Sequence, residues 1–120
     1  MTAEEEREKL LADLGRQARV VAGREIYFDW EGFLWDPNDW DEEVARILAL
    51  ESGLADLSEV HWKVLRFFRE YYFYHGRAPM NRHLKEGARL SLGEIESLFP
   101  GGIRRGARRL AGLPNPKSCF

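Results

Sequence analysis

A stripe of apolar residues at helical spacing after Ser58 constrains the fold of this chain more than any other feature. The stripe consists of Val60, Val64, Leu65, Phe68, Tyr71 and Tyr72. Residues spaced in this way line one face of a helix, and such a face usually packs into a core. Ser58 can accept hydrogen bonds from the first-turn amides, and Gly76 suits the end. The spacing therefore predicts a core helix between Ser58 and Gly76.

Three shorter helical patterns surround this one. An apolar face through Trp40, Val44, Ile47 and Leu48 predicts a helix that Asn38 or Asp39 caps and Gly53 ends. The stretch MNRHLKEGA predicts a short helix with Pro79 in its first turn and with Met80 and Leu84 facing inward. Ser91 and Glu94 form a capping-box pattern for a helix that ends at Pro100. The chain is therefore expected to be mainly helical.

The two ends of the chain differ from this pattern. Leu10, Leu11, Leu14 and Ala18 predict an amino-terminal helix from Glu4 to Ala22. REIYFDWEGFLWDP then predicts a β-hairpin that turns around Asp29 to Gly32. A last helix is expected from Ile103 to Ala111, ending at Gly112. Beyond it Pro114 and Pro116 exclude helix and favour an extended arm.

These expectations define one domain with two appendages. A chain of 120 residues has room for one hydrophobic core. We expect an amino-terminal extension over residues 1–23, helical or partly disordered, a helical domain over 24–111 and a mobile arm over 112–120. The expected fold class is mainly α, a small orthogonal bundle with helix-turn-helix-like packing and an amino-terminal hairpin.

Charge is balanced overall but uneven along the chain. Eighteen basic and 20 acidic side chains give a net charge of −2, which provides no general reason to bind nucleic acid or an anionic membrane. The carboxyl-terminal segment nevertheless has five cations, Arg104, Arg105, Arg108, Arg109 and Lys117, and no acidic side chain. No apolar run reaches the roughly 20 residues of a membrane span, and the start MTAEEEREKL does not resemble a signal peptide. We expect a cytoplasmic protein without a membrane partner.

The single cysteine, Cys119, is next to last in the chain. A lone thiol cannot form an internal disulfide, and the three histidines show no metal-ligand spacing with it, so we expect no metal and no organic cofactor. An exposed thiol on an arm can attack a donor persulfide, hold the sulfur and deliver it to another protein. The neighbouring cations favour the thiolate only if the arm folds back over them.

Several blocks in this order resemble the DsrC/TusE family of sulfur-carrier proteins. They are DWEGFLWDPNDW, HWKVLRFFREYY, RAPMNRHLKEGA, LFPGG and AGLPNPKSC, and together they extend from about Arg24 to Phe120. The resemblance implies that Cys119 accepts persulfide sulfur. Family members of the DsrC type have a second arm cysteine where this chain has Arg108, so the one-cysteine, TusE-like branch fits better.

The resemblance also implies roles and partners. A TusBCD/DsrEFH-type complex would donate sulfur, and an MnmA-type tRNA thiolase or another sulfur-accepting protein would receive it, with indirect tRNA contact. The chain would be an enzyme only as one step of a sulfurtransferase relay. In this hypothesis Gly112 is the hinge, Leu113, Pro114 and Pro116 extend the arm, and the four arginines with Lys117 dock a partner or stabilise the thiolate. Those cations are equally consistent with a solvated helix face.

Three alternatives remain from the sequence. A DsrC-like carrier or regulator would act in sulfur oxidation instead of tRNA thiolation. A helix-turn-helix DNA-binding regulator matches the short helices, although the charge balance and the glycine and alanine interruptions of the arginine cluster oppose it. A third alternative is an interaction module with the tail as a peptide ligand.

Overall fold

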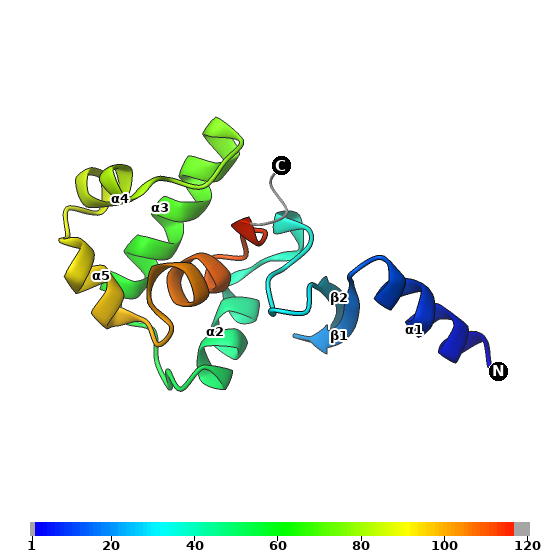
Figure 1. Ribbon diagram of the computed structural model, residues 1–120. Helices are drawn as coiled ribbons and strands as arrows, with labels where there is room; N and C mark the ends of the chain where they lie inside the picture. Colours follow the sequence, from blue (N-terminus) through cyan, green and yellow to red (C-terminus); the bar gives the residue numbers. More distant parts are fainter. Residues whose placement is uncertain (1, 117–120) are drawn as a thin grey trace.

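The computed structural model describes residues 2–116 and shows a mainly helical fold with an amino-terminal antiparallel hairpin (Figure 1). The elements are helix α1 (Ala3–Asp13), strands β1 (Gln17–Val21) and β2 (Arg24–Phe28), the 3₁₀ turn η1 (Pro37–Asp39), helices α2 (Glu42–Glu51), α3 (Glu59–His75), α4 (Asn81–Ala88) and α5 (Leu92–Leu98), and the π-helical segment η2 (Gly102–Arg108). The expected fold class is confirmed. Two residues of the expected site, Lys117 and Cys119, lie outside the described part of the chain.

The hairpin is present, but its position was wrong in the sequence analysis. β1 pairs with β2 in antiparallel register, from Gln17 opposite Phe28 to Val21 opposite Arg24. Ala22 and Gly23 form the two-residue turn with φ of 53° and 74°, and positive φ at both positions matches the twist of a tight hairpin. The helix expected up to Ala22 therefore ends at Asp13, because the strand that completes the hairpin begins at Gln17.

The expected turn around Asp29 to Gly32 exists as a loop after the hairpin. Its Asp29 carboxylate accepts from the backbone amides of Glu31 at 2.9 Å and Phe33 at 3.0 Å. Only an isolated bridge joins Phe28 to Leu34 there. Since β1 and β2 lie on either side of Gly23, the pairing crosses the expected domain boundary, and the boundary itself stays a prediction.

Local capping signals predicted several helix ends correctly. Ser58 accepts from the amide of His61 at the start of α3, and Gly76 ends that helix with φ of 76°. Ser91 and Glu94 make the expected capping box. The cap of α2 is instead Asp41, which accepts from the amide of Val44 at 2.8 Å, since the 3₁₀ turn occupies the residues just before it.

At α4 the helix was predicted correctly but two of its details were not. The helix begins at Asn81, so Pro79 precedes it, and Met80 is the residue before its first turn. Met80 is 52% exposed, whereas Leu84 is fully buried. Only Leu84 of the two residues expected inward therefore contributes to the core.

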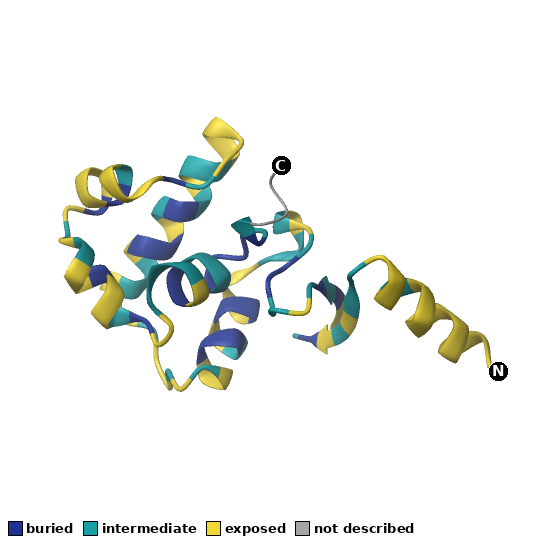
Figure 2. Ribbon diagram, in the orientation of Figure 1, coloured by how far each residue is buried: buried dark blue, intermediate teal, exposed yellow. Residues whose placement is uncertain are grey.

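Burial concentrates in the hairpin, α2, α3 and the carboxyl-terminal segment, while α1 has no buried residue and is mostly exposed (Figure 2). The largest fully buried side chains include Phe28, Phe33, Phe68, Leu48, Leu65, Leu84, Ile95, Leu110 and Leu113. This core brings α3 and the end of the chain into one packed unit.

The last helix was expected to be an ordinary α-helix and is π-helical over Gly102–Arg108. Gly101 and Gly102 both have positive φ at its start, 89° and 74°. Inside the segment, a Cβ added to Gly106 would lie 2.6 Å from the Phe99 Cβ, a distance that no real side chain tolerates. The glycines thus allow a wide turn to pack closely on the end of α5, and π-helical turns recur at functional sites.

Candidate functional site

The chain after η2 is anchored to the domain before it reaches Cys119. Leu110, Ala111 and Leu113 are fully buried. The Trp40 Nε1 donates to the Leu110 carbonyl at 2.8 Å, and Arg69 on α3 donates to the Ala111 carbonyl at 2.9 Å. We call residues 110–115 the arm root. Two side chains from separate parts of the sequence, Trp40 and Arg69, thus bind its first two carbonyls.

Arg69 connects the arm root to the loop before α2. Besides the Ala111 carbonyl it donates to the Pro37 carbonyl at 3.0 Å. Its guanidinium lies 4.1 Å from the Trp40 ring centroid and 5.0 Å from that of Phe73, within range of cation–π attraction. Desolvation by burial lowers the pKa of Arg69 to about 10, so the side chain stays protonated near neutral pH.

Gly112 of the arm root lies against Trp40 at a position where only glycine fits. Its φ is +75°, and an added Cβ would lie 2.6 Å from the Trp40 Cγ and 2.7 Å from the Trp40 Cβ. A residue with a side chain would therefore clash with the ring that binds the Leu110 carbonyl. The hinge role of Gly112 stays a prediction, and both of its neighbours in the chain are buried.

Asn115 is the buried polar residue of the described chain, with 5% exposure. Its Oδ1 accepts from Arg104 at 2.9 Å. Its Nδ2 donates to the Asp29 Oδ2 at 2.9 Å and to the Glu31 carboxylate. The arm root is thus bound to η2 on one side and to the loop after the hairpin on the other. Nothing in the sequence indicated that Asn115, Asp29 and Glu31 meet at this site, because no local pattern relates residues so distant along the chain.

Three of the four expected arginines contact this same region. Arg104 bonds to Asn115 and lies 3.6 Å from the Glu31 carboxylate, and Arg105 pairs with Glu31 at 2.8 Å. The Arg108 Nε donates to the Pro114 carbonyl at 3.1 Å. Arg104 and Arg108 therefore hold the arm root, and Arg104 and Arg105 neutralise the Glu31 carboxylate.

Arg109 points elsewhere. It donates to the Ser52 hydroxyl at the end of α2 and to the Arg105 carbonyl at 2.9 Å. Desolvation by burial lowers the pKa of Arg109, while the carboxylate of Glu51 acts in the opposite direction. The bonds of Arg109 thus join η2 to the end of α2.

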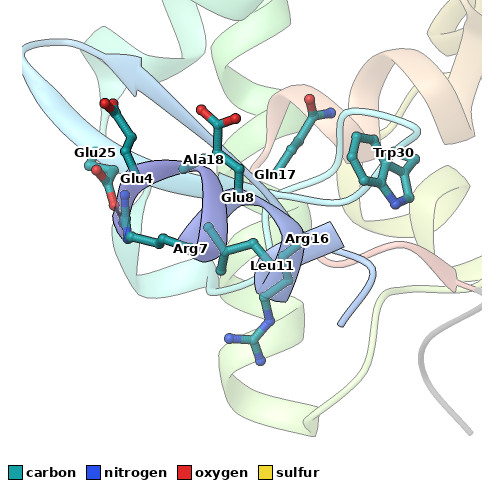
Figure 3. Close-up of a pocket in the computed structure, with 9 residues that line it drawn as sticks. All are labelled: Glu4, Arg7, Glu8, Leu11, Arg16, Gln17, Ala18, Glu25 and Trp30. Carbon is teal, nitrogen blue, oxygen red and sulfur yellow. Dashed lines mark hydrogen bonds and ion pairs between the residues drawn. The ribbon is translucent and has the colours of Figure 1, made fainter. Parts of the chain in front are cut away.

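A separate cavity of about 320 Å³ lies between α1 and the hairpin (Figure 3). Its lining includes Glu4, Glu8, Arg16 and the exposed ring of Trp30, and none of the arm-root residues.

Within residues 2–116 no group of three or more histidine, cysteine or acidic side chains could hold a metal ion. No helix of that part is long and apolar enough to cross a membrane. The expected residues Gly112, Leu113 and Pro114 lie in the arm root, and Arg104 and Arg108 bind it, so the arm root is the candidate site.

Comparison with known proteins gives consistent matches. Residues 20–120 match the family model described as DsrC like protein. The gamma subunit of dissimilatory-type sulfite reductase from Nitratidesulfovibrio vulgaris is 37% identical over 97 residues, which are 81% of this chain and 92% of that protein. Sulfurtransferase TusE from Photorhabdus laumondii is 36% identical over 108 residues, 84% of this chain and 96% of that protein.

A solved structure agrees with these sequence matches. The crystal structure of the oxidized gamma subunit of dissimilatory sulfite reductase (DsrC) from Archaeoglobus fulgidus has a TM-score of 0.74 and 38% identity, and the match covers 87% of this chain and all of that one. The family match begins at residue 20, within β1, which supports the hairpin as part of the family fold. The predicted resemblance is confirmed, and the chain belongs to the DsrC-like family.

Proposed function

We propose that this protein is a persulfide sulfur carrier that accepts sulfur on Cys119. The relatives' names, sulfurtransferase TusE and sulfite reductase gamma subunit, confirm the expected sulfur-relay function for the chain. One observation carries the assignment to Cys119. The only thiol of the protein follows, four residues later, an arm root that is bound to the domain through Asn115.

The proposed chemistry uses a single cysteine of this chain and no cofactor. The Cys119 thiolate attacks the terminal sulfur of a donor persulfide, the S–S bond of the donor breaks, and the donor thiolate leaves. Cys119 then holds the outer sulfur as its own persulfide. An acceptor thiolate attacks that outer sulfur and releases the Cys119 thiolate again. The sulfur changes partners while the protein ends in the state in which it began.

The basic residues have two proposed uses. Arg104, Arg105 and Arg108 hold the arm root through the contacts described above, which is compatible with docking of an acidic partner by the parts of these side chains that remain exposed. Arg105, whose side chain is 62% exposed, presents the most accessible charge of the three. For Lys117 we propose that its cation favours the thiolate, since it is two residues from Cys119. Arg109 is bound at α2 and contributes to packing there.

For the partners we propose a TusBCD/DsrEFH-type donor complex and, as acceptor, an MnmA-type tRNA thiolase in the cytoplasm. A second candidate, a carrier in dissimilatory sulfur metabolism, is favoured by the relative named as the gamma subunit of sulfite reductase. The single cysteine excludes an internal disulfide cycle in either case. The absence of a thiol at position 108, where the Arg108 side chain binds the Pro114 carbonyl, agrees with one-cysteine transfer.

Intact-protein mass spectrometry tests the proposal. After incubation with a persulfide-loaded sulfurtransferase, we expect a gain of one sulfur, about 32 Da, that reductant reverses and that Cys119→Ser abolishes. The serine variant also separates the alternatives, because DNA binding or docking of the tail as a peptide would survive it. No mass gain with several donors would contradict the carrier function of this thiol.

A further inference from the structure

A second basic surface of the domain lies on α4, at the opposite end of the molecule from α1 (Figure 1). Arg82 and Lys85 are three residues apart on this helix, so their side chains are neighbours on one face. Leu84 and Ala88 on the other side of the helix are fully buried, so the basic face is turned toward solvent (Figure 2). Arg89 follows as the residue that caps the helix. We call Arg82, Lys85 and Arg89 the α4 cations.

None of the α4 cations is neutralised within residues 2–116. Their side chains make no hydrogen bond or ion pair in that part of the chain, and Glu86, the one acidic residue of the helix, does not pair with them. In contrast, both arginines of the hairpin strands, Arg19 and Arg24, pair with acidic side chains, at 2.7 and 2.9 Å. The α4 cations are therefore available to groups outside the described chain.

Arg89 has a backbone conformation that is unfavourable for its residue type. Its φ is 57° and its ψ is 36°, in the left-handed region where helices usually end on glycine, as α3 does at Gly76. A residue with a side chain in this region costs free energy, and such residues concentrate at functional sites. The strain and the unpaired guanidinium together indicate that Arg89 has a use that glycine would not serve.

Two exposed apolar residues are connected to the start of α4. Met80, which precedes the helix, is 52% exposed, and Tyr74, near the end of α3, is 85% exposed. A series of rings runs from Tyr74 to α4 through His75, Tyr71 and His83, with centroids 4.8, 4.1 and 5.0 Å apart. The His83 Nδ1 also accepts from the Met80 amide at 3.1 Å. These contacts fix the two apolar residues in place at the junction of α3 and α4.

We propose that the α4 cations, with Tyr74 and Met80, form a docking surface for an acidic segment of a partner protein. Carboxylates of that segment pair with the cations, and its apolar side chains cover Tyr74 and Met80, since arginine, tyrosine and methionine are enriched in protein interfaces. A nucleic acid fits this surface less well. The chain as a whole has a net charge of −2, so the surface around α4 repels an extended polyanion, whereas a partner protein needs negative charge only at the contact.

Fluorescence anisotropy of a labelled peptide tests the docking surface on the full chain. The probe is a synthetic helical peptide with glutamates at i, i+3 and i+7 and leucines beside them, and its glutamine analogue is the uncharged control. We expect saturable binding of the glutamate peptide that weakens as salt is added, and a loss of affinity of about fivefold in Arg82→Glu. Lys63→Glu reverses an exposed charge on α3 and should change the affinity by less than about twofold.

Arg89→Gly separates docking from folding. Glycine relieves the left-handed backbone and removes the cation, so we expect an equal or higher melting temperature and an affinity about threefold lower. A residue with only a structural role would not combine these two effects. Unchanged affinity in both Arg82→Glu and Arg89→Gly would overturn the proposal. An equal loss in Lys63→Glu, or no saturable binding of the peptide by wild type, would do the same.

Further measurements identify a different occupant. A labelled single-stranded RNA oligonucleotide that bound more tightly than the peptide and lost affinity in Arg82→Glu would overturn the choice of a protein partner. Sedimentation would detect pairing of α4 with the acidic α1 of a second copy, and loss of that association in Arg82→Glu would overturn an external partner. Peptide binding should be equal in Cys119→Ser, because the surface does not use the thiol. Failure of sulfur loading would therefore contradict the proposed function and leave the docking surface intact.

Discussion

Substituting Gly112 with alanine tests whether the arm root is packed as described. Two costs follow from the structure. The backbone has φ of +75°, in the left-handed region, which costs a residue with a side chain about 1 kcal/mol. The added methyl group would also lie 2.6 Å from the Trp40 Cγ, and overpacking of this kind costs about 1–3 kcal/mol. We therefore expect Gly112→Ala to lower the free energy of unfolding by about 2–4 kcal/mol.

Gly76 offers a matched control for this measurement. Its φ is +76°, nearly the same, but an added Cβ would meet no atom within 4 Å. The backbone cost and the change in unfolded-state entropy are therefore common to both substitutions, and only the contact with Trp40 differs. We expect Gly76→Ala to lower the free energy of unfolding by about 1 kcal/mol.

Urea unfolding, monitored by circular dichroism and tryptophan fluorescence, measures both values. Thermal unfolding should show the same order, with a shift of about 4 °C for each kcal/mol in a domain of this size. Equal destabilisation by the two alanines would refute the argument that Gly112 is constrained by Trp40. In a Trp40→Ala background the cost of Gly112→Ala should fall by about 1–2 kcal/mol, because the double-mutant cycle isolates the contact.

Three further predictions follow from the same structure. Leu113→Ala should lower the free energy of unfolding by about 2–5 kcal/mol in urea, because it empties a fully buried site, and a loss below about 1 kcal/mol would contradict that burial. Arg69→Met should cost about 2–4 kcal/mol, because the Ala111 and Pro37 carbonyls each lose a charged donor, and the loss should be constant from pH 6 to 8. Burial lowers the pKa of Arg69 to about 10, which is still well above pH 8, so Arg69 is protonated in the folded and unfolded states and a loss that varied with pH in this range would implicate another group. Ser58→Ala should cost about 1 kcal/mol in thermal unfolding by removing the cap of α3, and no loss would show that the cap is not used.

The sequence predicted the helices best where the signal was local. A cap and the residues that it binds are three positions apart, and an apolar face repeats within one or two turns, so Ser58, Ser91 and the stripe of α3 could be recognised directly. The amino-terminal segment was predicted less well. Ala18, at helical spacing from Leu14, lies in strand β1, because pairing with β2 decided its conformation. Spacing of a few apolar residues cannot distinguish these outcomes when the partner strand is uncertain.

The candidate site, like the helices, was predicted from the sequence only in part. The penultimate cysteine, the prolines and the cluster of arginines were evident from the sequence, and the resemblance they support proved correct at the level of the family. The contacts that hold the arm root were not evident from the sequence. Trp40 was expected only on the apolar face of a helix, and nothing in the sequence singled out Arg69, although the two side chains bind the carbonyls of Leu110 and Ala111.

By itself, then, the sequence determined the helical class, the lone terminal thiol and the family. Only the tertiary structure decided where the segment that carries the thiol is held. Asn115 finds Asp29 and Glu31 more than 80 residues earlier in the chain, and the π-helical turn brings Arg104 to the same point. Such contacts depend on how the helices pack, because a buried amide is satisfied by whichever polar groups the fold places beside it and not by its neighbours in sequence.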